Sequence, residues 1–356
     1  MTRATLALLL AGLVCASPAR AQGPTTHAVA IDTTAAVDQA VTEGGVQSRT
    51  GFIFDAVVSA GLGRGFEVTA RPYLQRLPSG EWNRQIWIAE LRYERRGRYG
   101  VRAEAGLIPS PIGLANLTLR PAQNPTIAQP ASLFTPLPTL EAGAPRTTLM
   151  GAVYPYGASV TVSGTRWDAR AAILDSSPLR TRRVFGRVNP PRLPTVVYGA
   201  GVTPLVGLRV GASVAQGGWR VAGETPAVTA DQHATIVTAE AEYSVGFTKV
   251  SGEWVRDRLD TRGGHTVATG WFIQGQQTIT PRWFAAGRVE RMAAPAYLPS
   301  TGATARQRLQ GVEAIAGYRA TPDVTVRAGY RTRRAFGQPA FLNQFTVSLV
   351  WFQRWI

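Results

Sequence analysis

Apolar and polar residues alternate along a stretch near the C-terminus, DVTVRAGYRTRRAF, from Asp323 to Phe336. Its two sets of alternate positions are Val324, Val326, Ala328 and Tyr330 on one side, and Thr325, Arg327, Gly329 and Arg331 on the other. Successive side chains of a β-strand point to opposite faces of the sheet. The segment is therefore predicted to form a strand with one apolar and one cationic face.

The same alternation recurs in segments of about ten residues from Gly51 onward, which is typical of a transmembrane β-barrel. Examples are FEVTARPYLQR, YGVRAEAGL, LRVGASVA, IVTAEAEYSV and GVEAIAGYR. In the last of these, Ile315 falls on the polar side. No window repeats apolar residues at the three-and-four spacing of a helix. The fold class is therefore all-β, a transmembrane antiparallel barrel whose apolar faces contact lipid and whose arginines line the lumen.

The pattern predicts strands that begin near residues 51, 66, 84, 99, 156, 167, 195, 208, 234, 247, 266, 282, 308, 323 and 342. Bacterial barrels have an even number of strands. An extra strand at 146–155 would put the long stretch after Leu107 on the periplasmic side, so we expect the missing strand upstream, within 26–48. Sixteen strands are expected; fourteen and eighteen remain open.

Connections between the predicted strands alternate in length, as periplasmic turns and external loops do. The predicted turns are Gly246-Phe247, Thr280-Pro281 and Thr321-Pro322-Asp323. The predicted loops are 216–233, 256–265, 292–307 and 333–341. Tryptophans near strand ends are expected in the interfacial girdles; these are Trp82, Trp167, Trp219 and Trp283.

The N-terminus predicts an exported chain. Arg3 precedes an apolar run from Ala4 to Ala16, and Ala19-Arg20-Ala21 is typical of a signal cleavage site. We therefore divide the chain into a signal peptide (1–21), an N-terminal periplasmic segment that possibly includes the first strand (22–50), and an outer-membrane barrel (51–356). The only cysteine lies in the signal, and no later segment has eighteen consecutive apolar residues, so only a barrel can span the membrane.

Residues 108–155 form the longest irregular stretch and are rich in proline, which cannot donate to a strand ladder. Leucines along it require a packing partner, and in a barrel that partner is the lumen wall. We therefore predict a constriction loop folded toward the lumen, with Pro109, Pro111, Gly113 and Arg120 as its candidate residues. The chain ends in FTVSLVWFQRWI, which resembles the aromatic final strand of outer-membrane proteins.

Charge adds a functional expectation. The chain has 38 Lys+Arg against 22 Asp+Glu, and Lys249 is its only lysine. An exported protein rarely meets nucleic acid, so anionic solutes, outer-membrane lipids and lipopolysaccharide phosphates are the expected partners. Arginines in a pore favour anions, whereas acids on the same faces oppose that preference. The candidate pore-lining residues are Arg71, Arg102, Arg209, Arg288, Arg327, Arg331, Glu104, Glu240 and Glu242.

The stretch VRAEAGLIPSPIGLANL, Val101 to Leu117, resembles the strand and loop of outer-membrane porins related to the phosphate-selective type. There a strand that ends in glycine leads to a Pro-x-Gly turn, here Pro111-Ile112-Gly113. The resemblance implies a sixteen-stranded diffusion pore that assembles as a homotrimer. Phosphate-selective members also carry lumen lysines, and this sequence lacks that set.

Catalytic and metal chemistry find little support in the sequence. A nucleophilic serine needs a histidine base, and the mature chain has only His27, His233 and His265, with no G-x-S-x-G motif. No cysteine–histidine cluster or calcium-loop pattern is present, so we expect no cofactor and no metal. The sequence thus predicts a porin for small polar solutes with a weak preference for anions such as phosphate or carboxylates. A non-conducting structural or adhesive barrel and a barrel enzyme remain as alternatives.

Overall fold

A computed structural model describes residues 29–43, 48–76, 80–114, 119–141, 143–144, 147–150, 155–180, 193–224 and 228–355. The predicted signal peptide, residues 1–21, lies outside these ranges. No helix in the described ranges is both long enough and apolar enough to cross a membrane.

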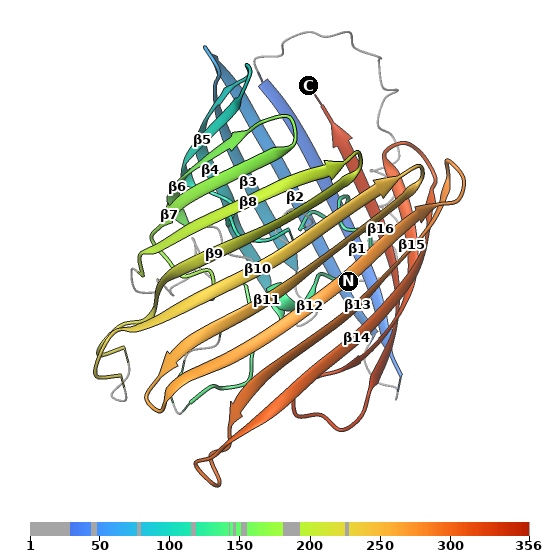
Figure 1. The fold of residues 1–356 in the computed structure, drawn as a ribbon. Helices are drawn as coiled ribbons and strands as arrows, with labels where there is room; N and C mark the ends of the chain where they lie inside the picture. The colour runs from blue at the N-terminus through green and yellow to red at the C-terminus, as the bar shows by residue number, and fades with distance from the viewer. Residues whose placement is uncertain are drawn as a thin grey trace.

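Sixteen antiparallel strands form one closed barrel, in which each strand pairs with its neighbours in sequence (Figure 1). The strands are β1 (Val29–Thr42), β2 (Ser48–Gly63), β3 (Phe66–Arg76), β4 (Trp82–Arg95), β5 (Gly100–Leu107), β6 (Tyr156–Ser163), β7 (Trp167–Leu174), β8 (Thr195–Leu205), β9 (Leu208–Arg220), β10 (Gln232–Val245), β11 (Thr248–Thr261), β12 (Gly264–Thr278), β13 (Trp283–Tyr297), β14 (Thr304–Arg319), β15 (Val324–Arg334) and β16 (Leu342–Arg354). One short helix, α2 (Ala131–Phe134), lies in the connection between β5 and β6.

The barrel closes between its first and last strands. β1 pairs with β16 over eleven positions, from Asp32 opposite Arg354 to Thr42 opposite Gln344. The Arg354 Nε donates to Asp32 Oδ1 at 2.8 Å across this seam. The strand expected within residues 26–48 is therefore present as β1, and the barrel begins at Val29, inside the segment that was assigned to 22–50.

Alternating burial shows which side chains face inward. In β15, Val326, Ala328 and Tyr330 are exposed on the outer side, whereas Arg327 between them is buried. In β10, Glu240 is likewise buried between the exposed Ala239 and Ala241. The prediction for β15 is thus correct: Val326, Ala328 and Tyr330 face outward, and Arg327 faces inward.

The longer connections lie at the end of the barrel where β2 begins, and the connection between β11 and β12 is the exception. β11 and β12 are joined by a turn at residues 262–263, so 256–265 is not a loop as predicted. The loops predicted at 292–307 and 333–341 shrink to 298–303 and 335–341. Polar residues occupy both faces of β11 and β12 near their shared turn, and the sequence pattern cannot separate such a strand end from a polar loop. The end of β13 is instead apolar and contains Pro295, a residue that interrupts the strand pattern.

Two outward assignments are wrong. Trp219 is fully buried, and its indole N–H donates to the Asp260 carbonyl at 2.9 Å, so it is not an interfacial residue. The alternation of YGVRAEAGL predicts Leu107 on the lipid face, but this side chain is 1% exposed and belongs to the interior apolar cluster. The preceding Gly106 has φ +126°, a conformation that breaks the regular alternation of the strand. Trp82, Trp167 and Trp283 are about half-exposed.

Candidate functional site

The long connection after β5 crosses the interior of the barrel. Its residue Leu114 donates its backbone N–H to Glu253 Oε2 of β11 at 3.1 Å. Gly113 lies beside that carboxylate with φ +72°, and an added Cβ would overlap the Glu253 side chain. Pro109 and Pro111 precede it at half-buried positions. Because β5 and β11 are distant in the sheet order, this contact places the loop across the lumen.

The loop next reaches the seam of the barrel through Arg120. The Arg120 Nη2 donates to Thr34 Oγ1 at 3.0 Å and to the Asp32 carbonyl at 3.3 Å, both on β1. The Asp55 carboxylate lies 3.7 Å from Arg120 Nε. Burial lowers the pKa of Arg120, and the negative charge of Asp55 opposes that change. Arg120 is thus a structural anchor of the loop on β1.

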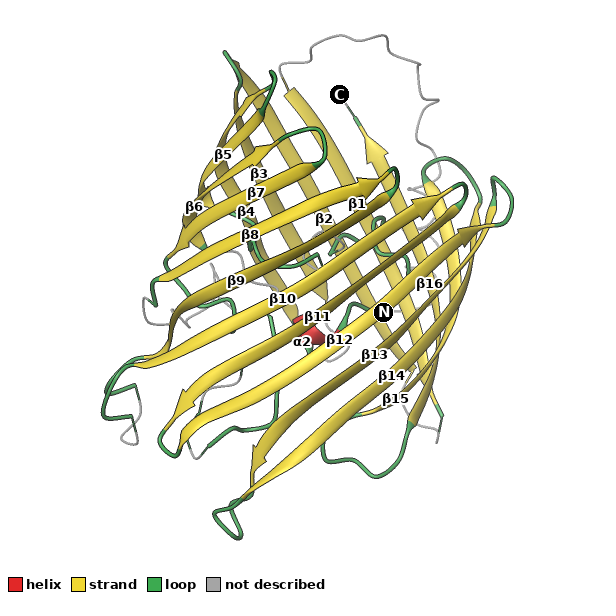
Figure 2. Ribbon diagram, viewed as in Figure 1, coloured by secondary structure: helices red, strands yellow, loops and turns green. Residues whose placement is uncertain are grey.

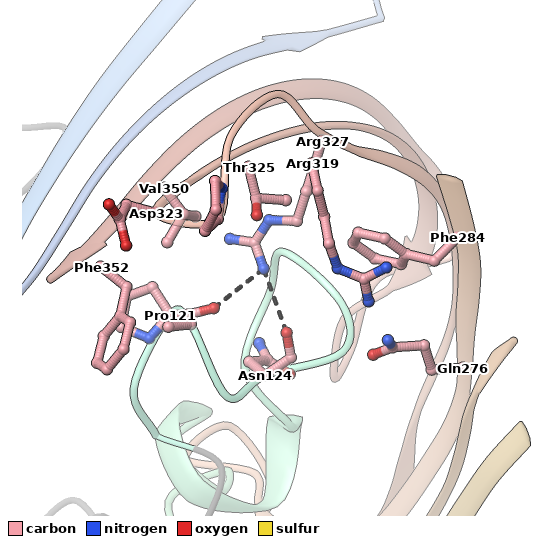
Figure 3. A pocket seen from close by; sticks show the side chains of 12 residues that line it. Pro121, Asn124, Gln276, Phe284, Arg319, Asp323, Thr325, Arg327, Val350 and Phe352 are labelled. Atoms are coloured by element: carbon pink, nitrogen blue, oxygen red, sulfur yellow. Dashed lines mark hydrogen bonds between the residues drawn. The ribbon is translucent and has the colours of Figure 1, made fainter. Parts of the chain in front are cut away.

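Two arginines of the barrel wall hold residues 121–128. Arg288 donates to Asn124 Oδ1 and the Ala128 carbonyl, each at 2.9 Å. Arg327 donates to the carbonyls of Pro121 and Asn124, each at 3.2 Å (Figure 3). It also donates to the Thr126 carbonyl at 3.0 Å. Both side chains face inward as predicted, but they are only 2% and 4% exposed. They bind the loop and are largely covered by it, although Arg327 also lines a cavity beside the loop.

Carboxylates of the same wall accept the backbone N–H groups of the loop. Glu313 Oε1 accepts from Ile127 and Ala128 at 3.0 Å each. Glu290 Oε2 accepts from Ala131, the first residue of α2, at 2.8 Å, and Figure 2 shows α2 inside the ring of strands. These bonds satisfy buried N–H groups that no strand or helix pairs.

Apolar packing explains why the loop carries leucines. Leu119, Leu133 and Leu137 are buried in one cluster with Phe272 and Met292 of the wall. Ile315, the residue on the wrong side of the β14 pattern, lies with Ile127 of the loop around Gly329. The inner face therefore supports the loop with apolar residues as well as with charged ones.

Arg331 and Arg71 also point inward and are paired. Arg331 donates to Glu290 Oε1 at 2.9 Å, so Glu290 links β15 to the loop. Arg71 binds Asp55 through two N–H groups, at 2.9 Å and 2.6 Å, and its guanidinium lies 4.8 Å from the centre of the Trp87 ring. Arg71 and Asp55 are both buried, so this pair supports the wall rather than contacting solute.

The wall opposite the loop carries a network of partly exposed ion pairs. Arg102 Nε donates to Glu104 Oε1 at 2.6 Å on β5. Arg209 of β9 bridges Asp168 Oδ1 at 2.9 Å and Glu240 Oε1 at 2.7 Å. Of the predicted acids, Glu104 and Glu240 thus belong to this network.

Further members of the network extend it along the wall. Arg170 lies 3.5 Å from Glu240 and donates to Ser213 Oγ at 2.6 Å. Arg92 binds Glu90 at 2.7 Å and lies 3.3 Å from Glu104. The remaining predicted acid, Glu242, pairs with Lys249 at 2.8 Å in a more exposed position.

Glycines on β8 and β9 give these side chains room to lie against the wall. A Cβ on Gly199 would lie 2.6 Å from Arg170 Nε, and one on Gly201 would lie 2.5 Å from Arg209 Nη2. A Cβ on Gly211 would lie 2.9 Å from Glu240 Oε1. The side chains of the network therefore lie flat along the sheet, which leaves space in the lumen beside them.

A cavity of about 220 Å³ lies beside the loop at the end of the barrel with the tight turns (Figure 3). Phe284, Phe352 and Gln276 line it together with Arg319, whose guanidinium stacks 4.9 Å from the centre of the Phe284 ring. Arg319 Nη1 donates to the Pro281 carbonyl at 3.1 Å. The inner wall therefore also carries an arginine that does not hold the loop.

One histidine of the described residues, His265, pairs with an acid. His265 Nδ1 lies 2.7 Å from Asp260 Oδ1 at the end of the β11–β12 hairpin, and the described residues near it include no serine hydroxyl bonded to that ring. Across the described ranges, no three His, Cys, Asp or Glu residues are grouped to hold a metal ion.

Several functional residues were missed from the sequence. Asp55, Asp168, Arg92 and Arg170 all face inward and complete the ion pairs described above. Asp168, Arg92 and Arg170 lie on the polar set of their alternating segments, so the pattern already placed them on the lumen side; Asp55 shares its set with Ile53 and Val57 and gave no such signal. The glycines opposite them gave no such signal.

No protein-family model matches the chain, and no curated protein matches it. Solved structures do resemble it. Salmonella typhi OmpF has a TM-score of 0.62 at 9% identity, covering 91% of this chain and 97% of that one. The anion-selective porin of Comamonas acidovorans has 0.61 at 10%, covering 91% and 99%. A loop L8 deletion mutant of Vibrio cholerae OmpT, an outer membrane protein, has 0.58 at 13%, covering 91% and 99%.

These likenesses concern the fold. A closed sixteen-stranded antiparallel barrel with apolar outward faces satisfies every backbone group within lipid and leaves no open edge. The chain is therefore an outer-membrane β-barrel protein of bacterial type, built like the porins.

Proposed function

We propose that this chain is a porin through which small polar solutes diffuse passively, with a weak preference for anions such as phosphate or carboxylates. It performs no catalysis. The long loop narrows the pore, because it crosses the lumen and is bonded to β1, β11, β13, β14 and β15. The solute path runs between the loop and the ion-pair network of β4–β10.

The weak anion preference rests on one observation, the unequal exposure of the paired charges. In the pairs Arg102–Glu104 and Arg209–Glu240, the arginine side chains are 45% and 28% exposed, against 12% and 0% for the acids. Water in the lumen therefore reaches the guanidinium groups more than the carboxylates. Each acid still cancels most of the field of its arginine, so the preference stays weak.

The zero-current potential of the purified, folded protein in a planar bilayer under a KCl gradient tests this proposal. We expect current steps and a potential of the sign for chloride. The double variant Arg102→Gln and Arg209→Gln should move the potential toward zero or reverse it. Arg95→Gln removes an exposed arginine that lies at the same end of the barrel but faces outward, and it should leave the potential unchanged. A potential of the sign for potassium in the unmodified protein would disprove the anion preference, and the current steps would still support a porin.

The same proposal includes the finer features that the sequence predicts. Residues 1–21 are removed as a signal peptide, and lipopolysaccharide and other outer-membrane lipids surround the barrel. The protein assembles as a homotrimer; OmpT of Vibrio cholerae, which shares the fold, has been described in a trimer form. The Val101–Leu117 resemblance supports a relation to the phosphate-selective porins, although the lysines of those porins are missing.

A barrel that conducts nothing is the competing function, and the number of bonds that hold the loop favours it. A loop so firmly seated plugs the lumen if it fills the whole cross-section. Heat-modifiability in electrophoresis shows whether the protein is folded. Folded protein that gives no current steps would favour the plugged barrel over the porin.

A further inference from the structure

Arginines occur on the outward face of the barrel, where lipid is expected. They lie in four strands of one sector, β11, β13, β14 and β15, near the ends that lead to the loops (Figure 1). The six residues are Arg256, Arg258, Arg291, Arg306, Arg308 and Arg334. Their neighbours in sequence, such as Asp257, Met292 and Leu309, are buried on the inner face, which fixes the outward direction of the arginines. We call these six residues the outer arginine patch.

The pairing register brings the patch together. Arg256 lies opposite Thr269 of β12, which lies opposite Ala293 of β13, which in turn lies opposite Arg308 of β14. Gln310 of β14 lies opposite both Arg291 and Arg334 in the neighbouring strands. The six guanidinium groups thus share one continuous surface of five adjacent strands.

No acid neutralises this surface. Among the described residues, none of the six arginines forms an ion pair, and two of them make a side-chain hydrogen bond, Arg306 to Thr269 at 3.4 Å and Arg334 to Gln310 at 3.1 Å. Asp260 is the one acid at an outward strand position of β10–β15 in these ranges, and its partner is His265, at 2.7 Å. In the lumen, by contrast, four of the six candidate arginines pair with a carboxylate: Arg71, Arg102, Arg209 and Arg331.

The height of the patch matches the outer edge of the lipid. Exposed apolar residues lie next to it on the side of the tight turns, among them Trp254, Trp271, Val289 and Val312. Arg256 and Arg291 are each eight residues from the tight-turn end of their strand. At about 3.3 Å per residue and a tilt of about 40°, eight residues rise about 20 Å, and ten residues about 25 Å. The apolar band of such barrels is about 25 Å tall, so the patch lies at its outer boundary.

We propose that the outer arginine patch binds the phosphate groups of the phosphorylated glycolipid of the outer leaflet, lipopolysaccharide. Guanidinium groups bind phosphate oxygens in pairs of parallel hydrogen bonds, and several of them around one anion strengthen the contact. Arginine-rich composition alone does not explain the patch, because the outward strand positions of β5–β8 carry no arginine. The neighbouring Trp254 and Trp271 offer apolar surface to the acyl chains below the headgroup.

Native mass spectrometry of the folded full-length mature chain in neutral-detergent micelles tests the site. The probes are diphosphoryl lipid A and its dephosphorylated form. We expect the phosphorylated form to bind more tightly, and the double variants Arg256→Gln/Arg308→Gln and Arg291→Gln/Arg334→Gln each to weaken it roughly tenfold. Arg95→Gln, an exposed outward arginine at the other rim, is the matched control and should change nothing. Raising KCl should weaken binding of the phosphorylated form only.

Three results would overturn the proposal. Equal affinity for both forms of lipid A would show an apolar annulus without phosphate recognition. Inorganic phosphate that displaces lipid A at equal concentration would show a site for the free anion. A change in oligomeric state on mutation, seen by light scattering, with unchanged lipid affinity would assign the surface to a second copy of the chain. The site does not depend on pore activity, so the variants should keep the conductance of the unmodified protein.

Discussion

The bond network around Arg288 predicts how firmly the loop is held. Replacing this residue by methionine keeps much of its volume but removes the guanidinium group. That group donates to Asn124 Oδ1, the Ala128 carbonyl, Thr126 Oγ1 and Gln274 Oε1, and it is 2% exposed. The loop residues 124–128 would lose their central donor, and all four of these oxygens would lose one bonding partner.

The cost of this change can be worked from general magnitudes. A hydrogen bond to a charged group contributes about 1.5–3 kcal/mol, and Arg288 makes three such bonds to the loop, so their loss costs at least about 3 kcal/mol. The barrel keeps its strand ladder, so the cost falls on the docked state of the loop. At about 1.4 kcal/mol per tenfold change, the ratio of docked to released loop falls by at least a hundredfold.

Single-channel recording in a planar bilayer measures this effect directly. Arg288→Met should show frequent transitions between the level of the unmodified protein and a larger conductance, because the released loop opens the lumen. Arg319→Met removes an inward arginine that bonds to the Pro281 carbonyl and not to the loop, so its current should stay steady. Identical mean current and noise in Arg288→Met and the unmodified protein, with both folded, would refute the idea that the Arg288 network holds the loop.

Two further substitutions test smaller parts of the structure. Gly106→Ala should lower the midpoint of thermal unfolding, because Gly106 has φ +126° and an added Cβ would lie 2.4 Å from the Ala89 carbonyl oxygen; Gly263→Ala, with open space around it, is the control and should unfold at the normal temperature. Lys249→Gln should change the free energy of unfolding by less than about 1 kcal/mol in urea titration, because the Lys249–Glu242 pair is exposed and screened; a larger loss would show that the pair is structural.

Alternation in the sequence was sufficient for the barrel and for the direction of most side chains. Each strand has its own two-residue period, and the even number of strands located the missing one before Gly51. The prediction was less accurate where the alternation does not indicate which face of a strand is buried. At the ends of β11 and β12 both faces are polar, so the segment 256–265 was predicted as a loop.

The candidate site was harder to predict because its contacts join residues far apart in the chain. The sequence placed Arg288 and Arg327 on the inner face but gave no sign that the loop would cover them. The bond from Arg327 to the Pro121 carbonyl spans 206 residues. Ile315 was a usable signal: an apolar residue on a polar face indicates an interior partner, which the loop supplies through Ile127.

The position of the loop anchors along the chain sets an order for assembly. The loop leaves β5, but Arg288, Glu313 and Arg327, which hold it, belong to β13, β14 and β15. Further anchors are Glu253 on β11 and Thr34 on β1, the strand that closes against β16. A chain that has formed only its first twelve strands therefore lacks the side chains that hold residues 121–131, and the polar groups of that segment stay hydrated until the C-terminal strands arrive. Such long sequence separations slow folding, so docking of the loop and closure of the seam are late steps of assembly.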